Sequence, residues 1–275
     1  MTALTIGFVG AGRIGAAMVE RLLAAGHRVR LYARRPEVRD RLAALGAEPV
    51  DRIRDIAAAD VVVSCLFGDE QISTLLPEVV GAMGEATVLL SHTTGTPEVL
   101  HSLDRFAPSG PAAIVDATFS GTPEAVRAGK LVVFLGGTPE HVAVARRVVG
   151  CYAGTVIETG GRGSALRVKL INNLLFAAVS QLTLQGLTLG RGVGIDEGVM
   201  LEALAVSSGG STAGRYIVDR GGSESFAATV APFLHKDVAA CAAALTDSGV
   251  DFSALLAAAC GGPIDIGDVD PKEET

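Results

Sequence analysis

The chain has 275 residues, of which 49% are hydrophobic, and a formal net charge of −7 at pH 7. This length is enough for a substantial core and predicts two domains. The acidic balance argues against general nucleic-acid binding, which requires a basic surface. No signal peptide is evident before the first apolar segment, so we expect a soluble, cytoplasmic protein.

Four cysteines and one long apolar stretch require a separate interpretation. The cysteines are widely spaced, without a C-x-x-C pair or nearby histidines, which favours buried reduced thiols over a metal site; they are Cys65, Cys151, Cys241 and Cys260. The apolar stretch from Leu170 to Leu189 contains four amide side chains that would be costly in lipid. It therefore predicts a buried helix and no membrane span.

The first half of the chain alternates between strand-like and helix-like patterns. Leu4–Val9 is a short apolar run that ends at a glycine turn, as a buried parallel strand does. Ile14–Ala25 has apolar residues at helical spacing and stops before Gly26. Arg28–Tyr32 has the pattern of a second strand. Five further strands are predicted at Asp60–Leu66, Thr87–Ser91, Ala113–Ala117, Leu131–Leu135 and Gly154–Ile157. This order predicts an α/β fold with a doubly wound Rossmann sheet.

After Gly163 the strand pattern stops and the sequence is helical, with glycine- and serine-rich breaks at 190–194, 207–211 and 221–222. We therefore predict a Rossmann domain over residues 1–162 and an all-α domain over 163–262. Residues 263–275 contain two prolines and several acids, and are predicted to form an acidic tail.

The first helix of the second domain is predicted to be long, from Ser164 to Leu189. Four apolar residues lie near one of its faces, more than a small helical domain covers easily; they are Leu170, Leu174, Ala177 and Ala178. A homodimer would bury such a face. The alternative is that later helices of the same chain cover it.

The segment after the first predicted strand has the spacing of a dinucleotide-binding turn; it reads Gly10, Ala11, Gly12, Arg13, Ile14 and Gly15. Gly10 would allow the tight turn, Gly12 would let the backbone approach a pyrophosphate, and Gly15 would let helix and strand pack closely. The phosphates would bind at the amino end of the following helix. Because the motif follows a strand and begins a helix, its context supports this interpretation.

The end of the second strand favours NADP over NAD. An NAD site has an acidic residue here to accept from the ribose 2′-hydroxyl, whereas this chain has Ala33, Arg34 and Arg35. Guanidinium groups suit a 2′-phosphate because they donate in pairs to its oxygens. The alternative is that one arginine, Arg35 rather than Arg34, only covers the surface.

Lys169 and Asn173 are the candidate catalytic pair. They are four residues apart on a predicted helix, so their side chains lie on one face and could point at one substrate atom. In an apolar cleft, desolvation should lower the pKa of a lysine from about 10.4, which would make it a usable general base. The alternatives are a surface lysine and a buried amide in a helix contact.

Five segments in order give the chain a resemblance to the β-hydroxyacid dehydrogenases, the family of 3-hydroxyisobutyrate and 6-phosphogluconate dehydrogenases. They are Ile6–Gly15, Gly26–His27 with Ala33–Arg34, Asp116–Thr122, Gly160–Gly163 leading to Lys169–Asn173, and Lys236–Asp237. The resemblance covers nearly all of residues 4–250. It implies that Lys169 is the general acid/base and that Asn173 helps hold the substrate.

The same resemblance implies roles for other residues. Ser120, Gly121 and Thr122 would bind a substrate carboxylate or nearby hydroxyl. Lys236 would contact substrate and cofactor, while Asp237 would orient its helix. Leu66 and Thr94 match positions that line the cofactor in relatives.

We therefore expect an NADP-dependent oxidoreductase that transfers a hydride between nicotinamide and a small β-hydroxy acid or its semialdehyde or keto acid. One alternative is an imine reductase-like enzyme, although such relatives usually lack the lysine at 169. Another is a non-catalytic NADP-binding sensor. Its support is Thr122 and Ala165, where relatives often have glycine, together with the short C-terminal segment.

Overall fold

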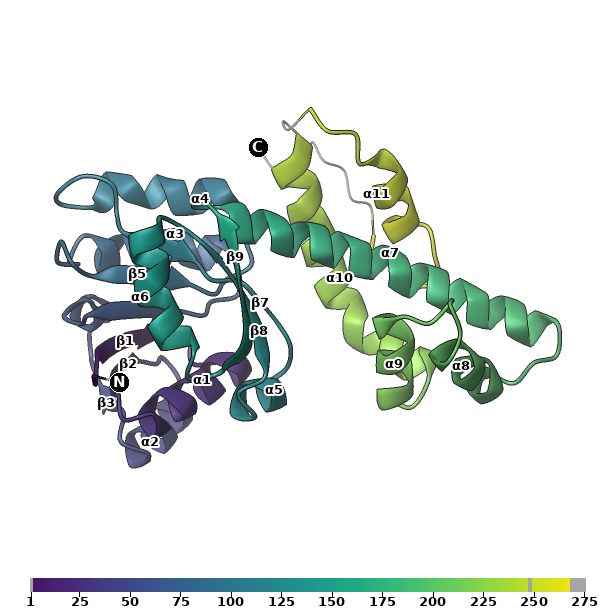
Figure 1. Ribbon diagram of the computed structural model, residues 1–275, viewed down its shortest axis with the longest axis horizontal. Helices are drawn as coiled ribbons and strands as arrows, with labels where there is room; N and C mark the ends of the chain where they lie inside the picture. Colours follow the sequence, from purple (N-terminus) through teal and green to yellow (C-terminus); the bar gives the residue numbers. More distant parts are fainter. Residues whose placement is uncertain (1, 247–248, 268–275) are drawn as a thin grey trace. The chain divides into compact units, whose positions relative to one another are not determined.

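The structure is a computed structural model that describes residues 2–246 and 249–267. It consists of two compact units, Met1–Lys169 and Leu170–Thr275. Figure 1 shows the sheet in the first unit and the helices of the second. The two units are described separately below.

The described part of the first unit contains a nine-stranded sheet in the order β3-β2-β1-β4-β5-β6-β8-β7, with β9 paired to β8. The strands are β1 (Thr5–Val9), β2 (Arg28–Tyr32), β3 (Glu48–Pro49), β4 (Val61–Ser64), β5 (Val88–Ser91), β6 (Ile114–Asp116), β7 (Phe119–Ser120), β8 (Leu131–Gly136) and β9 (Ala153–Gly160). The pairs from β3 through β6 are parallel, whereas β8 runs antiparallel to β6 and β7. This is the doubly wound Rossmann sheet that the sequence predicts.

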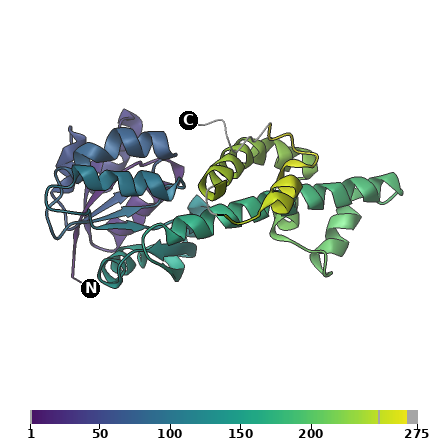
Figure 2. The ribbon, with the colours of Figure 1, turned by 90° about the horizontal axis from the view of Figure 1, so that it is seen from above.

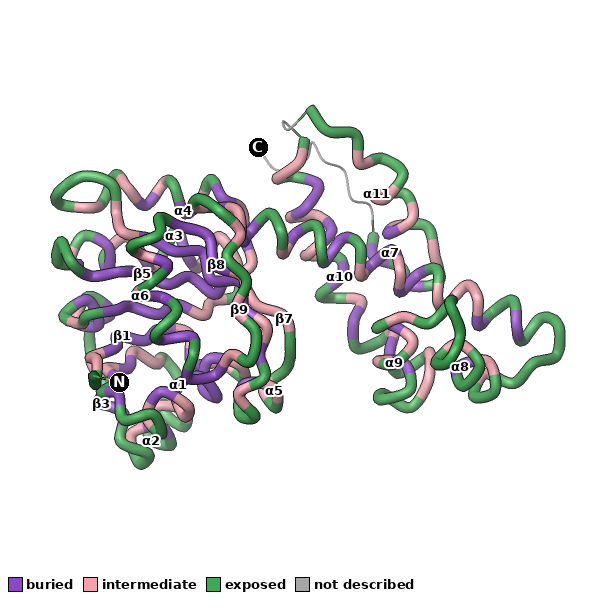
Figure 3. Tube along the Cα trace, viewed as in Figure 1, coloured by how far each residue is buried: buried purple, intermediate pink, exposed green. Residues whose placement is uncertain are grey.

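The central strands are buried because helices pack on both faces of the sheet (Figures 2 and 3). On one face, Phe8 and Leu31 share a core with α1 (Arg13–Ala24), α2 (Pro36–Ala44) and α6 (Pro139–Val149). On the other, Val62 and Leu89 pack with α3 (Asp69–Val80) and α4 (Pro97–Ser102). Parallel strands covered in this way read as continuous apolar runs, which is why the sequence pattern identified them.

The order of the sheet places a ligand crevice at the end of β1. The chain continues from β1 to β2 on one side, while β4 pairs with β1 on the other. In open α/β sheets, ligands bind at the carboxyl ends of strands where the order reverses in this way. The glycine turn that begins at Gly10 follows β1 at this point.

The described part of the second unit is helical. Its elements are α7 (Ser164–Gly192), α8 (Glu197–Ala205), α9 (Thr212–Asp219), α10 (Ser223–Thr246) and α11 (Ser253–Cys260). Leu170, Leu174, Ala177 and Ala178 are buried in one core with residues of the later helices, including Phe226 and Val238. The chain itself therefore covers the face on which the dimer prediction was based, and that part of the reasoning was wrong.

The boundary between the units differs from the predicted 162/163 because the first turn of α7 packs with the first unit, where Leu166 joins its core. The predicted tail at 263–275 also begins too early. Ile264 and Ile266 are buried in the core of the second unit, and residues 268–275 lie outside the described part.

By length and composition alone, α7 could cross a membrane. Half of its most apolar window is buried inside the structure, and one such helix is weak evidence for a membrane span. Gln181 illustrates the point, because its side chain is fully buried and bonds to the backbone of Ala259 and Ile264. The amides in this stretch therefore serve packing between segments of the second unit.

Candidate active site

The glycine turn after β1 has the geometry that a pyrophosphate site requires. Gly10 has φ +92°, a conformation that side chains rarely adopt, and a Cβ there would lie 2.2 Å from the carbonyl oxygen of Cys65. A Cβ on Gly15 would lie 2.2 Å from the carbonyl oxygen of Gly10. A Cβ on Gly12, by contrast, would meet no atom within 4 Å. The three glycines thus divide into two that the fold needs and one that keeps space open in front of the backbone.

Gly12 is also the N-cap of α1, and no side chain caps the first turn of that helix. The amino end of a helix has N–H groups without intrahelical partners and a partial positive charge, which together suit a phosphate. The turn therefore fits the diphosphate of a nicotinamide dinucleotide.

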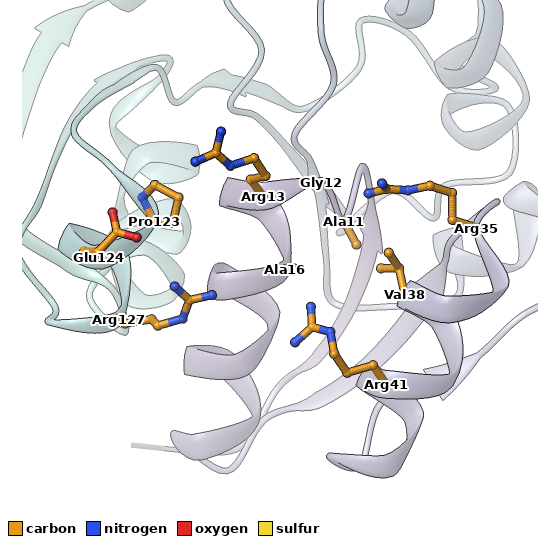
Figure 4. Close-up of a pocket in the computed structure, with 10 residues that line it drawn as sticks. All are labelled: Ala11, Gly12, Arg13, Ala16, Arg35, Val38, Arg41, Pro123, Glu124 and Arg127. Atoms are coloured by element: carbon orange, nitrogen blue, oxygen red, sulfur yellow. The ribbon is translucent and has the colours of Figure 1, made fainter. Parts of the chain in front are cut away.

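A pocket of about 290 Å³ lies beside this turn, between α1, α2 and α5 (Pro123–Arg127) (Figure 4). Its lining residues are Ala11, Gly12, Arg13, Ala16, Arg35, Val38, Arg41, Pro123, Glu124 and Arg127. Arg35 is the N-cap of α2 and lies 3.9 Å from the Glu37 carboxylate. Arg34 is exposed and does not line this pocket. Of the two arginines after β2, the structure thus places Arg35 in the pocket, whereas the sequence argument gave more weight to Arg34.

The other predicted cofactor residues lie at or beyond the carboxyl ends of their strands. Ala33 follows β2 and is half-buried. Leu66 follows β4, and its backbone N–H donates to the Thr93 hydroxyl at 3.0 Å. Thr94 follows β5 and is half-buried. The bond from Leu66 to Thr93 connects the loops after β4 and β5, at the edge of the sheet where the glycine turn lies.

The predicted substrate segment Ser120–Thr122 connects β7 to α5. Gly121 has φ +140°, and a Cβ there would approach the Leu131 side chain at 2.9 Å. Thr122 is the N-cap of α5, and its hydroxyl accepts from the Ala125 N–H at 3.3 Å. Thr122 therefore begins a short helix.

A buried histidine packs against the Phe119 ring, next to this segment. His92 is 1% exposed, its Nδ1 bonds to the Ala117 carbonyl, and its Nε2 lies 2.8 Å from the Tyr152 hydroxyl. Burial lowers the pKa of His92 to about 4, although the bond to Ala117 acts in the opposite direction. His92 is therefore neutral at pH 7 and links β5, β6 and β9.

Asp116 connects the substrate segment to the start of α7. This fully buried carboxylate accepts from the N–H groups of Gly163 at 2.7 Å and Leu166 at 2.9 Å. Burial raises the pKa of Asp116, while the backbone N–H groups partly offset that effect. Two residues on, the Thr118 hydroxyl donates to the Ala165 carbonyl at 2.8 Å. The first turn of α7 is thereby fixed to the strand that precedes Ser120.

Lys169 is one turn beyond this anchored start. It is half-buried and is the last residue of the first unit. Asn173 lies one turn further along α7, in the second unit, and is 7% exposed. Their spacing places amine and amide on one face of a continuous helix.

Asn173 is oriented by α10. Its Nδ2 donates to Asp237 Oδ2 at 2.8 Å, while its Oδ1 accepts from Asn172 at 3.2 Å. The Lys236 ammonium lies 3.8 Å from Asp237 Oδ1. Within the second unit, the structure thus brings Asn173 together with the predicted Lys236–Asp237 pair, which lies more than sixty residues further along the chain.

Sequence reasoning missed Glu20, Arg41 and Arg127. Arg41 and Arg127 line the pocket, and Glu20 accepts a hydrogen bond from each. Arg41 follows Val38 by one helical turn, which was a usable signal. The contact between Glu20 and Arg127 spans 107 residues and had no local signal.

Comparisons with known proteins agree with this geometry. Residues 5–161 match the family model for the NAD-binding domain of 6-phosphogluconate dehydrogenase, and residues 163–260 match that for the NAD-binding domain of NADP-dependent 3-hydroxyisobutyrate dehydrogenase. The chain belongs to the β-hydroxyacid dehydrogenase family. As a member of this family it is an NAD(P)-dependent dehydrogenase.

Two relatives from Pseudomonas aeruginosa illustrate the range of this family. The chain is 30% identical to a 3-hydroxyisobutyrate dehydrogenase over 212 residues, which cover 76% of the chain and 71% of the relative. It is 29% identical to an NAD-dependent L-serine dehydrogenase, with the same shares covered. The family thus includes relatives with different substrates.

Solved structures show the same two-domain fold. The Mycobacterium tuberculosis 3-hydroxyisobutyrate dehydrogenase with L-serine has a TM-score of 0.83 at 24% identity, covering 94% of this chain and 92% of its own. An imine reductase variant from Myxococcus stipitatus with NAD⁺ has a TM-score of 0.66 at 19% identity, with 96% of each chain covered. At these sequence identities, both comparisons show a similar fold and no more.

Proposed function

We propose that this family member transfers a hydride between NADP and a small β-hydroxy acid or its semialdehyde or keto acid. The observation that carries the proposal is the placement of Lys169 and Asn173 one turn apart on α7, with Asn173 held by Asp237. A sensor would have no use for an amine and a held amide at this spacing. The relatives named for 3-hydroxyisobutyrate and L-serine support a β-hydroxy acid as the substrate class.

The bound nicotinamide would supply a hydride acceptor for oxidation and a hydride donor for reduction. In oxidation, the neutral Lys169 amine takes the proton of the substrate hydroxyl while the C–H bond gives up its hydride. In reduction, the Lys169 ammonium returns that proton to the carbonyl oxygen. Asn173 donates to the same oxygen and thereby orients it toward the amine.

Ser120, Gly121 and Thr122 are proposed to bind the substrate carboxylate. The left-handed Gly121 turns the chain at this point, and the Ser120 and Thr122 hydroxyls on either side of it would donate to the carboxylate. Asp116 and Thr118 fix this segment to the first turn of α7. Within the first unit, carboxylate binding and Lys169 thus depend on the same set of buried bonds.

The preference for NADP is proposed from the arginines beside the glycine turn. Arg35 replaces the acidic residue that would accept from a ribose 2′-hydroxyl and would repel a 2′-phosphate. Gly10–Gly15 would hold the diphosphate, while Leu66 and Thr94 would line the nicotinamide half. Lys236, held near Asp237, is proposed to contact substrate and cofactor.

A homodimer is proposed through a face of α7 other than the one first considered. Four exposed apolar side chains follow one another at spacings of four and seven residues, which places them on one helix face. They are Ile171, Leu175, Leu182 and Leu189, exposed by 47%, 51%, 55% and 72%. Burying this stripe against a second copy would remove it from water.

A cytoplasmic location is also proposed, because all four cysteines are unpaired, as is usual in reducing compartments.

The test is a substrate panel of small aldehyde acids, keto acids and cyclic imines, assayed with NADPH and with NADH. We expect turnover of an acid-bearing carbonyl and a higher kcat/KM with NADPH. Turnover of imines alone would move the protein to the imine reductase alternative. Tight NADPH binding with no turnover of any acid would contradict the dehydrogenase proposal and favour a sensor.

A further inference from the structure

The pocket beside the glycine turn is strongly cationic, although the chain as a whole is acidic. Four arginines and a single glutamate are its charged lining residues, in a chain of net charge −7. They come from three elements, α1, α2 and α5, as Figure 4 shows. A concave site with this excess of guanidinium groups is suited to a ligand that carries phosphate.

Two of these arginines are held by one carboxylate. Glu20 lies on α1, one turn beyond the pocket-lining Ala16, and accepts from Arg41 Nη1 at 2.6 Å and from Arg127 Nε at 3.1 Å. The Glu20 side chain is 22% exposed. Burial opposes its ionisation, but the bonds from Arg41 and Arg127 outweigh that effect and lower the pKa of Glu20.

The two guanidinium groups extend toward α1 from opposite walls, Arg41 from α2 and Arg127 from α5 (Figure 4). Because both share Glu20, the three side chains keep one net positive charge. Each bond to Glu20 uses one N–H group of a guanidinium that has five. Donors thus remain on the Arg41 side chain, which is 49% exposed.

Arg35, the N-cap of α2, would bind a phosphate only weakly by itself. Its side chain is 62% exposed and lies 3.9 Å from the Glu37 carboxylate. Exposed charge pairs contribute little because solvent screens them. A second guanidinium held in place within the pocket would supply the paired donors that a phosphate dianion requires.

We propose that Arg41 is a specificity-determining residue that binds the 2′-phosphate of NADP together with Arg35, and that Glu20 is a positioning residue that holds Arg41 in the pocket. This inference rests on the proposed NADP preference. Arg127 contributes by sharing Glu20, so that the carboxylate does not neutralise Arg41. The specificity of this chain would therefore extend beyond the end of β2, into α1, α2 and α5.

The test measures binding of adenosine 2′,5′-bisphosphate and of 5′-AMP by isothermal titration calorimetry, without turnover. Wild type should bind the bisphosphate more tightly than 5′-AMP. Arg41→Ala should weaken bisphosphate binding about ten- to a hundredfold, as expected for lost charge-assisted bonds, and should leave 5′-AMP binding unchanged. Arg41→Lys should recover part of the loss. Thermal melts of each variant check that the fold is intact.

Arg39→Ala is the matched control. Arg39 lies on the same helix, pairs with Asp40 at 3.5 Å, and does not line the pocket. Its substitution removes one positive charge from α2 and should leave the affinity for both ligands unchanged. An equal loss in Arg39→Ala and Arg41→Ala would show a general charge effect and would overturn the role of Arg41.

Glu20→Gln separates positioning from charge. If Glu20 positions Arg41, bisphosphate binding weakens even though the pocket becomes more positive. If Glu20 only neutralises charge, binding strengthens and the positioning role is overturned.

The wild-type result separates this inference from the proposed function. Equal binding of both ligands by wild type would refute the NADP preference itself. A wild-type preference that survives in Arg41→Ala would refute only the role of Arg41.

Discussion

Two glycines of the turn after β1 should affect different properties when each is replaced by alanine, one the stability of the protein and the other its affinity for the cofactor. Gly12→Ala and Gly15→Ala add the same methyl group to the same motif, three residues apart. The added Cβ meets nothing within 4 Å at Gly12, whereas at Gly15 it would lie 2.2 Å from the Gly10 carbonyl oxygen. The two variants should therefore fail in different assays.

For Gly15→Ala, the clash is with backbone, so either the strand or the helix must move. Overpacking of this kind costs about 1–3 kcal/mol, and for a unit of this size each kcal/mol lowers the melting temperature by about 2–4 °C. We expect a loss of about 2–12 °C. Gly12 has φ −74°, which alanine adopts readily, and alanine at an N-cap costs about 0.5–1 kcal/mol relative to glycine. The melting temperature of that variant should change by no more than about 4 °C.

In folded protein, Gly12→Ala should lose more affinity for NADPH than Gly15→Ala. The Gly12 methyl group would occupy the space through which the diphosphate approaches the backbone. Losing one or two charge-assisted bonds, each worth about 1.5–3 kcal/mol, weakens binding at least about tenfold. Thermal melts and NADPH fluorescence titration measure the two effects. Wild-type affinity in Gly12→Ala, or wild-type stability in Gly15→Ala, would refute the reasoning.

Three further predictions concern buried bonds and the exposed face of α7. Because burial lowers the pKa of His92 to about 4 from an ordinary 6.5, the unfolded chain binds more protons between these values. The free energy of unfolding should therefore fall by about 3 kcal/mol as pH drops from 6.5 to 4. Acid-unfolding curves of His92→Gln should lack this loss. Identical curves for wild type and variant would contradict the prediction. Asp116→Ala leaves two N–H groups without their acceptor and should cost about 2–4 kcal/mol in urea unfolding, whereas the exposed Asp60→Ala should cost less than about 1 kcal/mol; equal costs would contradict this account. Leu182→Glu should shift a dimer to a monomer in light scattering, while wild type that is already monomeric would refute the dimer proposal.

Sequence patterns predicted the first unit well because its signals are local. All seven predicted strands are present. The central ones are buried parallel strands, which form continuous apolar runs. The two strands that the patterns missed, Glu48–Pro49 and Phe119–Ser120, have only two residues each and carry no periodic signal. The glycine turn was equally readable, because spacing alone assigns different tasks to Gly10, Gly12 and Gly15.

Contacts between distant segments could not be predicted in the same way. The helical period placed Leu170 and Leu174 on an apolar face but could not show that the chain's own later helices cover it. The bond from Asn173 to Asp237 joins residues 64 apart. Asp116 was identified only as part of a motif, and its function as the acceptor for the start of α7 required the structure.

The central claim is that Lys169 transfers the proton that accompanies hydride transfer. The most direct test is the single-turnover rate of NADPH oxidation with a saturating keto or aldehyde acid, in wild type and Lys169→Ala, with Arg167→Ala as an exposed control on the same helix. We expect Lys169→Ala to lose about 10²–10⁴ in rate while NADPH affinity and thermal stability stay at wild-type values, and Arg167→Ala to react like wild type. A Lys169→Ala rate within a few-fold of wild type would contradict the account.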